Sequence, residues 1–162
     1  MSGDVDFSEY FAARVQRFRR VAFALSGDWH AAEDLVQAMF VQLYRRWRRV
    51  RPGTVDAYAR RILVNLFLTG RRVSGREYVT SSVPDRESPP GRDTSLRLDV
   101  ERALAGLTPR QRAMVVLRFL EDLPVSEVAT LLGVAEGTVK SQTARGVEAL
   151  RAVLPSQTGE ER

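Results

Sequence analysis

Residues 125–150 read VSEVATLLGVAEGTVKSQTARGVEAL, and their spacing has the layout of a helix-turn-helix. A small residue, Ala129, stands where two helices would cross closely, and Gly133, four positions later, allows a left-handed turn. We therefore predict helices over about 126–132 and 136–154, flanking a turn at Gly133-Val134-Ala135. Four apolar residues are expected to face inward and fix a steep crossing angle: Val128, Leu132, Val134 and Val139.

The second of these helices carries side chains rich in hydrogen-bond donors, which can reach base edges and phosphates in a DNA major groove. These residues are Lys140, Ser141, Gln142 and Arg145, with Glu136 at the start. A plain helical hairpin would tolerate them too, but it would require neither the small–Gly–apolar spacing nor the polar face. The motif therefore favours DNA binding.

The positive charge of the chain is concentrated in one segment. Residues 41–79 hold ten arginines against Asp56 and Glu77, a net of +8, so the remaining residues sum to −3 in a chain of net charge +5. A solvated helical face is the alternative interpretation, but so dense a cluster is typical of a surface that binds a polyanion.

Helical periodicity continues upstream, and no segment shows sustained strand alternation. We predict helices over about 7–25, 30–47 and 55–69, with Asp28 as the N-cap of the second and Gly70 ending the third. Apolar stripes are expected along these helices: Phe7, Phe11, Val15, Phe18 and Ala22; Leu35, Met39, Leu43 and Trp47; Ile62, Leu63, Leu66 and Phe67.

A change of composition divides the chain. Residues 79–95 read VTSSVPDRESPPGRDTS, which is typical of a linker, and Thr108-Pro109-Arg110-Gln111 then reads as a capping box that opens a new helix. Asp122-Leu123-Pro124 is expected to close that helix. The predicted fold is all-α, with two small helical domains (1–78 and 99–154), a flexible linker (79–98) and a tail (155–162).

Composition argues against an enzyme. The chain has one histidine, His30, no cysteine, and none of the nucleophile, phosphate-loop or metal-cluster motifs that catalysis requires. We therefore expect no catalytic residue, no metal, no cofactor and no small-molecule substrate. The absence of a signal peptide and of a long apolar run predicts a cytoplasmic protein that does not insert into a membrane.

Three stretches resemble the extracytoplasmic-function (ECF) sigma factors of bacterial RNA polymerase. Residues 107–146, LTPRQRAMVVLRFLEDLPVSEVATLLGVAEGTVKSQTARG, resemble the region that reads the promoter −35 element. ALSGDWHAAEDLVQAMFVQLYRRW resembles the region that grips the polymerase clamp, and VDAYARRILVNLFLTGRR resembles the segment that melts and reads the −10 element. YRRW and GTVKSQTARG look closest to an actinobacterial, SigE-like subfamily.

The resemblance implies three sets of site residues. The polymerase-binding set, expected on one side of the second helix, is Asp34, Gln37, Ala38, Phe40, Val41 and Tyr44, although Phe40 and Tyr44 are also readable as core aromatics. The −10 set is Tyr58, Arg61, Asn65, Arg71 and Arg72, with the loop after Phe67. The −35 set is Thr138, Lys140, Ser141, Gln142 and Arg145.

Within the −35 set, Gln142 can pair with adenine and Arg145 with guanine through two hydrogen bonds each, whereas Lys140 suits phosphate. Ala135 stands where a serine often caps the helix.

The implied partners are core RNA polymerase, through the clamp of its β′ subunit, and promoter DNA, with the protein on the nucleoid when active. The sequence leaves open whether an anti-sigma factor holds the protein inactive. A stand-alone helix-turn-helix transcription regulator is the alternative function. Such a regulator would not need AEDLVQ followed by an arginine-dense helix.

Overall fold

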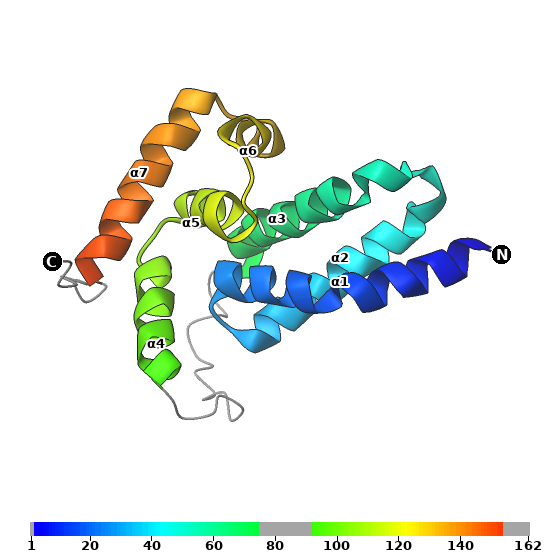
Figure 1. The fold of residues 1–162 in the computed structure, drawn as a ribbon, viewed down its shortest axis with the longest axis horizontal. Helices are drawn as coiled ribbons and strands as arrows, with labels where there is room; N and C mark the ends of the chain where they lie inside the picture. The colour runs from blue at the N-terminus through cyan, green and yellow to red at the C-terminus, as the bar shows by residue number, and fades with distance from the viewer. Residues whose placement is uncertain (1, 75–91, 154–162) are drawn as a thin grey trace, which may run out of the picture. The chain divides into compact units, whose positions relative to one another are not determined.

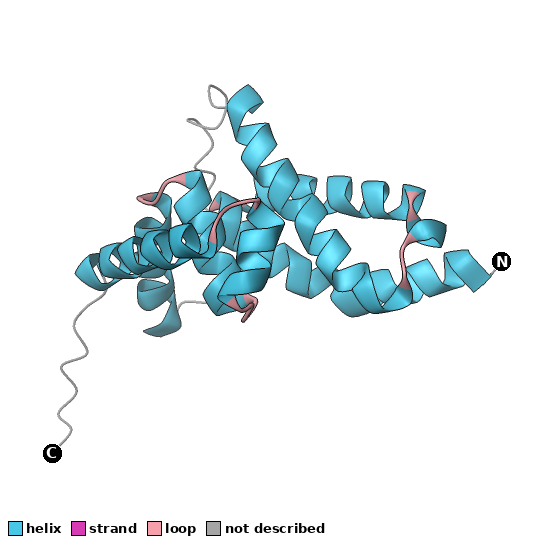
Figure 2. Cartoon of the chain, turned by 90° about the horizontal axis from the view of Figure 1, so that it is seen from above, coloured by secondary structure: helices cyan, strands magenta, loops and turns pink. Residues whose placement is uncertain are grey.

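The computed structural model describes residues 2–74 and 92–153, and in these ranges every regular element is a helix (Figure 2). The predicted all-α class is therefore confirmed. The chain divides into two compact units, Met1–Pro84 and Asp85–Arg162. Residues 79–91 of the predicted linker and the predicted tail, 155–162, lie outside the described residues.

The first unit is built from α1 (Ser2–Ser26), α2 (Trp29–Arg45) and α3 (Val55–Ser74), which alternate in direction (Figure 1). Two short turns of 3₁₀-helix, η1 (Trp47–Arg49) and η2 (Pro52–Thr54), connect α2 to α3. α1 packs on α2, and α2 packs on α3. Gly27 has a φ of 75° at the α1–α2 turn, which only glycine adopts at little cost.

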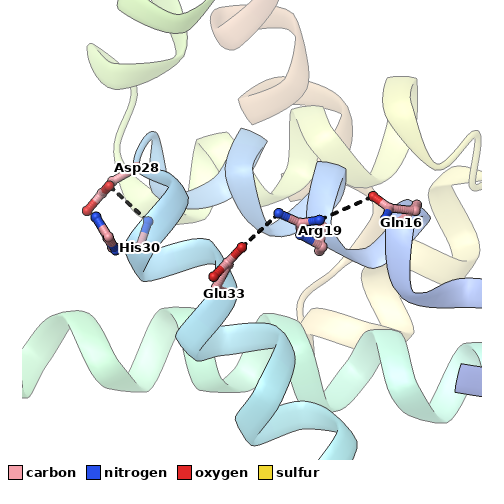
Figure 3. Close-up of polar contacts among 5 residues, drawn as sticks. All are labelled: Gln16, Arg19, Asp28, His30 and Glu33. Carbon is pink, nitrogen blue, oxygen red and sulfur yellow. Dashed lines mark hydrogen bonds and ion pairs between the residues drawn. The ribbon is translucent and has the colours of Figure 1, made fainter. Parts of the chain in front are cut away.

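The predicted N-cap of α2 is confirmed. The backbone N–H of His30 donates to Asp28 Oδ1 at 3.1 Å, which satisfies one of the free donors at the helix start (Figure 3). On the same helix, Glu33 Oε1 accepts from the Arg19 guanidinium of α1 at 2.7 Å. Both side chains are partly exposed, so this ion pair orients the two helices more than it stabilises them.

The core of the first unit is filled from all three helices. Met39 and Leu43 of α2 are fully buried as predicted, but Leu35 is only half-buried and Trp47 lies beyond α2 in η1. Val36 is buried instead of Leu35. The residues of this core are Phe18, Val21, Ala22 and Leu25; Ala31, Ala32, Val36, Met39, Phe40 and Leu43; Val55, Ala59, Ile62, Leu63, Val64 and Phe67.

α3 is longer than predicted. We expected Gly70 to end it, but the helix continues through Gly70 to Ser74. A glycine inside a helix costs about 1 kcal/mol relative to alanine, which weakens a helix without stopping it. Termination by glycine depends on a left-handed conformation, and that is recorded at Gly27 and Gly133.

The second unit contains α4 (Arg92–Ala105), α5 (Pro109–Val115), η3 (Val116–Leu120), α6 (Val125–Leu132) and α7 (Glu136–Val153). α7 packs against α4, α5 and α6, and the buried Arg112 of α5 donates from Nε to the carbonyl oxygen of Leu104 at 2.7 Å. The expectation of linker structure up to residue 98 is wrong for 92–98, which form the first turns of α4.

The predicted capping box opens α5. Gln111 N donates to Thr108 Oγ1, Thr108 N donates to Gln111 Oε1, each at 3.2 Å, and Pro109 occupies the first helical position. The helix then widens into the π-turn η3 and ends, as predicted, before Leu123 and Pro124. Asp122 has a φ of 57°, a left-handed conformation that is uncommon outside glycine.

Candidate nucleic-acid interfaces

The outward face of α2 carries most of the residues predicted to bind the polymerase. Asp34, Gln37, Val41 and Tyr44 are exposed, and Ala38 is half-buried. Val41 and Tyr44 retain 51% and 50% of their accessible surface, which is high for apolar and aromatic side chains. Since Met39 and Leu43 fill the opposite side of the helix, this set forms one continuous surface, here called the α2 face.

Phe40 does not belong to the α2 face. It is 4% exposed, and its ring lies among those of four α1 aromatics. The distances from the ring centroid of Phe40 to theirs run from 4.7 Å to 6.5 Å, and the rings meet largely edge-on. The four α1 aromatics are, from nearest to farthest, Phe11, Phe18, Phe7 and Tyr10. Such pairs add about 0.5–1.5 kcal/mol beyond burial. The assignment of Phe40 to the polymerase-binding set is therefore wrong, and its alternative interpretation as a core aromatic is right.

Tyr44 lies at the border between the α2 face and α1. Its hydroxyl donates to Asp4 Oδ1 at 3.0 Å, and its ring lies 4.9 Å from that of Phe7. The hydrogen bond to Asp4 raises the pKa of Tyr44 above its ordinary value. The phenol is thus held in position while half of its surface stays accessible.

α3 carries a second polar face. Tyr58, Arg61 and Asn65 are spaced three and four residues apart, which places them on one side of a helix. Arg61 and Asn65 are exposed and Tyr58 is half-buried, whereas Leu63 and Phe67 are buried on the opposite side. We call this surface the α3 face. The side chains of Arg71 and Arg72 lie outside the described residues, and the predicted loop after Phe67 is helix.

The first turn of α3 is anchored to α1 by a polar cluster. Asp56 Oδ1 accepts from the Tyr10 hydroxyl at 2.6 Å and from Arg14 Nε at 3.1 Å. Burial would raise the pKa of Asp56, but the hydrogen bonds from Tyr10 and Arg14 and nearby arginine charge outweigh it and lower the pKa. Burial, together with Asp56, raises the pKa of Tyr10 far above its usual range, so the phenol stays a donor.

The helix-turn-helix is confirmed in the second unit by α6, α7 and the turn between them. Gly133 has a φ of 67°, and Val134 N donates to the carbonyl oxygen of Ala129 at 3.0 Å, which closes the end of α6. Val128 and Val139 are fully buried and Ala129 is 6% exposed, as the close crossing requires. The other two predicted inward residues, Leu132 and Val134, are half-buried.

The outer face of α7 presents Thr138, Ser141 and Arg145, all exposed, and this set is called the α7 ridge. Ser141 Oγ donates to the carbonyl oxygen of Thr138 at 3.2 Å. Lys140 is exposed but stands to one side, where it lines an open depression of about 410 Å³ beside Phe119 and Val147. Lys140 is therefore displaced from the α7 ridge.

Gln142 is half-buried at the other edge of the ridge. Its Oε1 accepts a hydrogen bond from Gln111 Nε2 of α5 at 2.7 Å. The sequence identified Gln111 only as a member of the capping box. Nothing in local spacing indicates a contact between residues 31 positions apart, so this second role was missed.

Two negative observations apply to the described ranges, 2–74 and 92–153. No cluster of three or more His, Cys, Asp or Glu side chains there could hold a metal ion. No helix in the same ranges is long and apolar enough to cross a membrane.

Comparison with known proteins identifies the family of both units. Residues 11–77 match the model of sigma-70 region 2, and residues 97–150 match the model of sigma-70 region 4. The chain is 35% identical to the RNA polymerase sigma-E factor of Streptomyces avermitilis, over 94% of this chain and 87% of that one. It is also 35% identical to the ECF sigma factor SigE of Mycolicibacterium smegmatis, over 95% of its own length but 63% of the relative's.

A solved structure supports the same family assignment. The sigma factor RpoE of Bartonella quintana, determined in complex with the anti-sigma factor NepR, superposes with a TM-score of 0.75 at 27% identity. The match covers 91% of this chain and 96% of that one. The chain therefore belongs to the extracytoplasmic-function group of RNA polymerase sigma factors.

Proposed function

We propose that this chain binds core RNA polymerase and directs promoter-specific transcription initiation, with one exposed helix face for each of three contacts. The α2 face docks on the clamp of the β′ subunit, the α3 face reads the −10 element, and the α7 ridge reads the −35 element. The observation that carries this proposal is that each set lies on the exposed side of a helix whose other side is buried core.

The proposed division of labour follows the chain. Residues 1–78 bind polymerase and the −10 element, and residues 99–154 bind the −35 element. The linker is reduced from the predicted 79–98 to residues 79–91, because α4 begins at Arg92. The protein contributes no catalysis of its own and acts in the cytoplasm, on the nucleoid when engaged. An anti-sigma factor is a proposed further partner, supported by the relative that was solved with one.

Polymerase docking on α2 is supported by the chemistry of its face. Val41 and Tyr44 give accessible apolar and aromatic surface, and Asp34 and Gln37 give polar groups beside it. Interfaces concentrate binding energy in such partly apolar patches. The position of Tyr44 is fixed before binding, because its hydroxyl is held by Asp4, and a fixed side chain loses less entropy on association.

Charge reversal on the α2 face tests this docking. Asp34→Arg should abolish co-purification with core polymerase, because a cation replaces an anion within the contact, while helical content stays unchanged. Glu9→Arg on α1 is the matched control, an exposed acid given the same reversal outside the face. Equal retention of polymerase by both variants would refute the assignment.

The α3 face supplies what strand opening needs. Arg61 gives a cation for the DNA backbone, Asn65 gives a donor and an acceptor for an extruded base, and Tyr58 gives a ring for stacking. The anchoring of Asp56 to α1 holds the first turn of this helix rigidly, so the face is oriented by the core of its own unit.

For the −35 element, we propose that Arg145 and Gln142 carry base preference. A promoter-library selection with core polymerase tests this assignment. Arg145→Ala and Gln142→Ala should each relax the selected base at one or two positions, since a good base contact discriminates by about 1–3 kcal/mol. An unchanged preferred sequence in both variants would contradict it, even if both transcribe poorly.

A further inference from the structure

The side-chain amide of Gln111 has a defined orientation, because one of its partners can only donate. The backbone N–H of Thr108 points at Gln111 Oε1 at 3.2 Å. An N–H group must meet an oxygen, so the Nε2 end of the Gln111 amide has to face the opposite way. The capping box thus fixes the polarity of this side chain independently of anything on α7.

The orientation of the Gln111 amide in turn orients the amide of Gln142 on α7. Gln111 Nε2 donates to Gln142 Oε1 at 2.7 Å in a partly buried contact. An amide oxygen that accepts from α5 is turned towards α5, which leaves the Nε2 group of Gln142 as its outward, donating end. The amide of Gln142 is therefore held with its donor towards the groove side of the helix.

This orientation changes what Gln142 can read. Two-point pairing with adenine needs both amide atoms at the base edge, one accepting from N6 and one donating to N7. Because its oxygen is turned towards Gln111, Gln142 presents only its donor to the base edge. A donor can meet N7 of either purine, but O6 of guanine and O4 of thymine are further acceptors for it, whereas adenine and cytosine present amino donors at the equivalent positions, which do not match it.

We infer that Gln111, a residue outside the recognition helix, determines base preference by fixing Gln142 as a hydrogen-bond donor for keto bases, guanine or thymine, in the −35 element. The inference rests on the proposed role of the α7 ridge and deepens it. It also replaces the sequence-based expectation of a two-bond Gln142–adenine pair.

A single substitution should reverse the Gln111–Gln142 relay, by which we mean the pair of hydrogen bonds that orients the Gln142 amide through Gln111. Gln111→Glu keeps the capping box, since glutamate serves at that position as glutamine does, but a carboxylate only accepts. Gln142 must then turn its Nε2 towards residue 111 and present its oxygen to the DNA. The preferred base should change from guanine or thymine to adenine or cytosine, whose amino groups donate.

The test is a selection from a promoter library randomised across the −35 element, using core polymerase and the full chain. At the position that Gln142→Ala relaxes, the unsubstituted protein should select guanine or thymine. Gln111→Glu should favour adenine or cytosine there by about threefold to tenfold, the range that one net hydrogen bond gives. Arg110→Gln is the control: it removes the same unit of charge one residue away, on an exposed side chain, and should keep the original preference.

Circular dichroism confirms that the variants are folded. If Gln111→Glu does not fold, Gln111→Ala, which frees both amide atoms of Gln142, should raise selection of adenine alone. Retention of the original base by a folded Gln111 variant, while Gln142→Ala relaxes it, overturns the relay and leaves the role of Gln142 intact. If Gln142→Ala changes no position, the proposed role of Gln142 fails and the relay fails with it.

Discussion

The close approach of α5 to α7 leaves no room for a side chain at Gly146. A Cβ atom at Gly146 would lie 2.6 Å from Val115 Cγ2 and 3.6 Å from Leu107 Cδ1. Carbon atoms in favourable contact stay about 3.5–4.0 Å apart, so Gly146→Ala must push α5 and α7 apart by about 1 Å. Both neighbouring side chains are buried, so neither can swing into solvent.

The expected magnitude is a balance of two terms. Overpacking of a close-packed core costs about 1–3 kcal/mol. Replacing glycine by alanine within a helix returns about 1 kcal/mol. Gly146→Ala should therefore destabilise the second unit by about 0–2 kcal/mol. Gly137→Ala on the same helix, where a Cβ meets nothing within 4 Å, keeps only the favourable term and is the matched control.

The two tryptophans allow each unit to be followed separately. Trp29 and Trp47 both lie in the first unit, so tryptophan fluorescence reports its unfolding, while far-ultraviolet circular dichroism reports all helices. In denaturant titrations, Gly146→Ala should shift part of the dichroism transition to lower concentration and leave the fluorescence transition in place.

A second substitution isolates the clash. Val115→Ala removes Cγ2, so it should cost less stability in the Gly146→Ala background than in the unsubstituted protein, giving a coupling energy of about 1–3 kcal/mol. A Gly146→Ala variant as stable as Gly137→Ala would refute the reasoning.

Two further outcomes are expected. Because the pKa of Asp56 is lowered on folding, its contribution to stability is complete above the ordinary carboxyl pKa and is lost as the pH falls through the folded value. Asp56→Asn should thus destabilise the first unit at neutral pH by about 1 kcal/mol, after allowance for its partial exposure, and by progressively less below about pH 4, as tryptophan fluorescence unfolding curves would show. A constant difference down to pH 2 would argue against the Tyr10–Arg14 cluster. Lys140→Ala should weaken binding to every promoter about equally and lower the slope of log affinity against log salt concentration by about one. A loss confined to particular bases would show instead that Lys140 contacts a base edge.

Much of the second unit could be predicted from local signals. Thr108, Pro109 and Gln111 form a capping box whose residue types leave few alternatives, and Gly133 sits where a left-handed turn is required. These features depend on neighbours in sequence, so spacing alone placed α6 and α7 within about one residue of their observed bounds.

The errors arose where tertiary contacts decide. Phe40 lies at the edge of the α2 face by helical angle, yet four α1 rings cover it, and periodicity within α2 carries no information about α1. The hydrogen bond between Gln111 and Gln142 was missed for the same reason, since it joins two helices distant in sequence.

In vitro transcription tests the central claim most directly. Core RNA polymerase from Mycolicibacterium smegmatis, the source of one relative, would be mixed with this protein and a randomised promoter library, and the transcripts sequenced. We expect transcription start sites that depend on the added protein and that share two conserved sequence elements upstream. Arg145→Ala should alter the distal element, and Asn65→Ala should alter the proximal one. Transcription start sites that do not depend on the protein, or upstream elements that neither substitution changes, would contradict the proposed function.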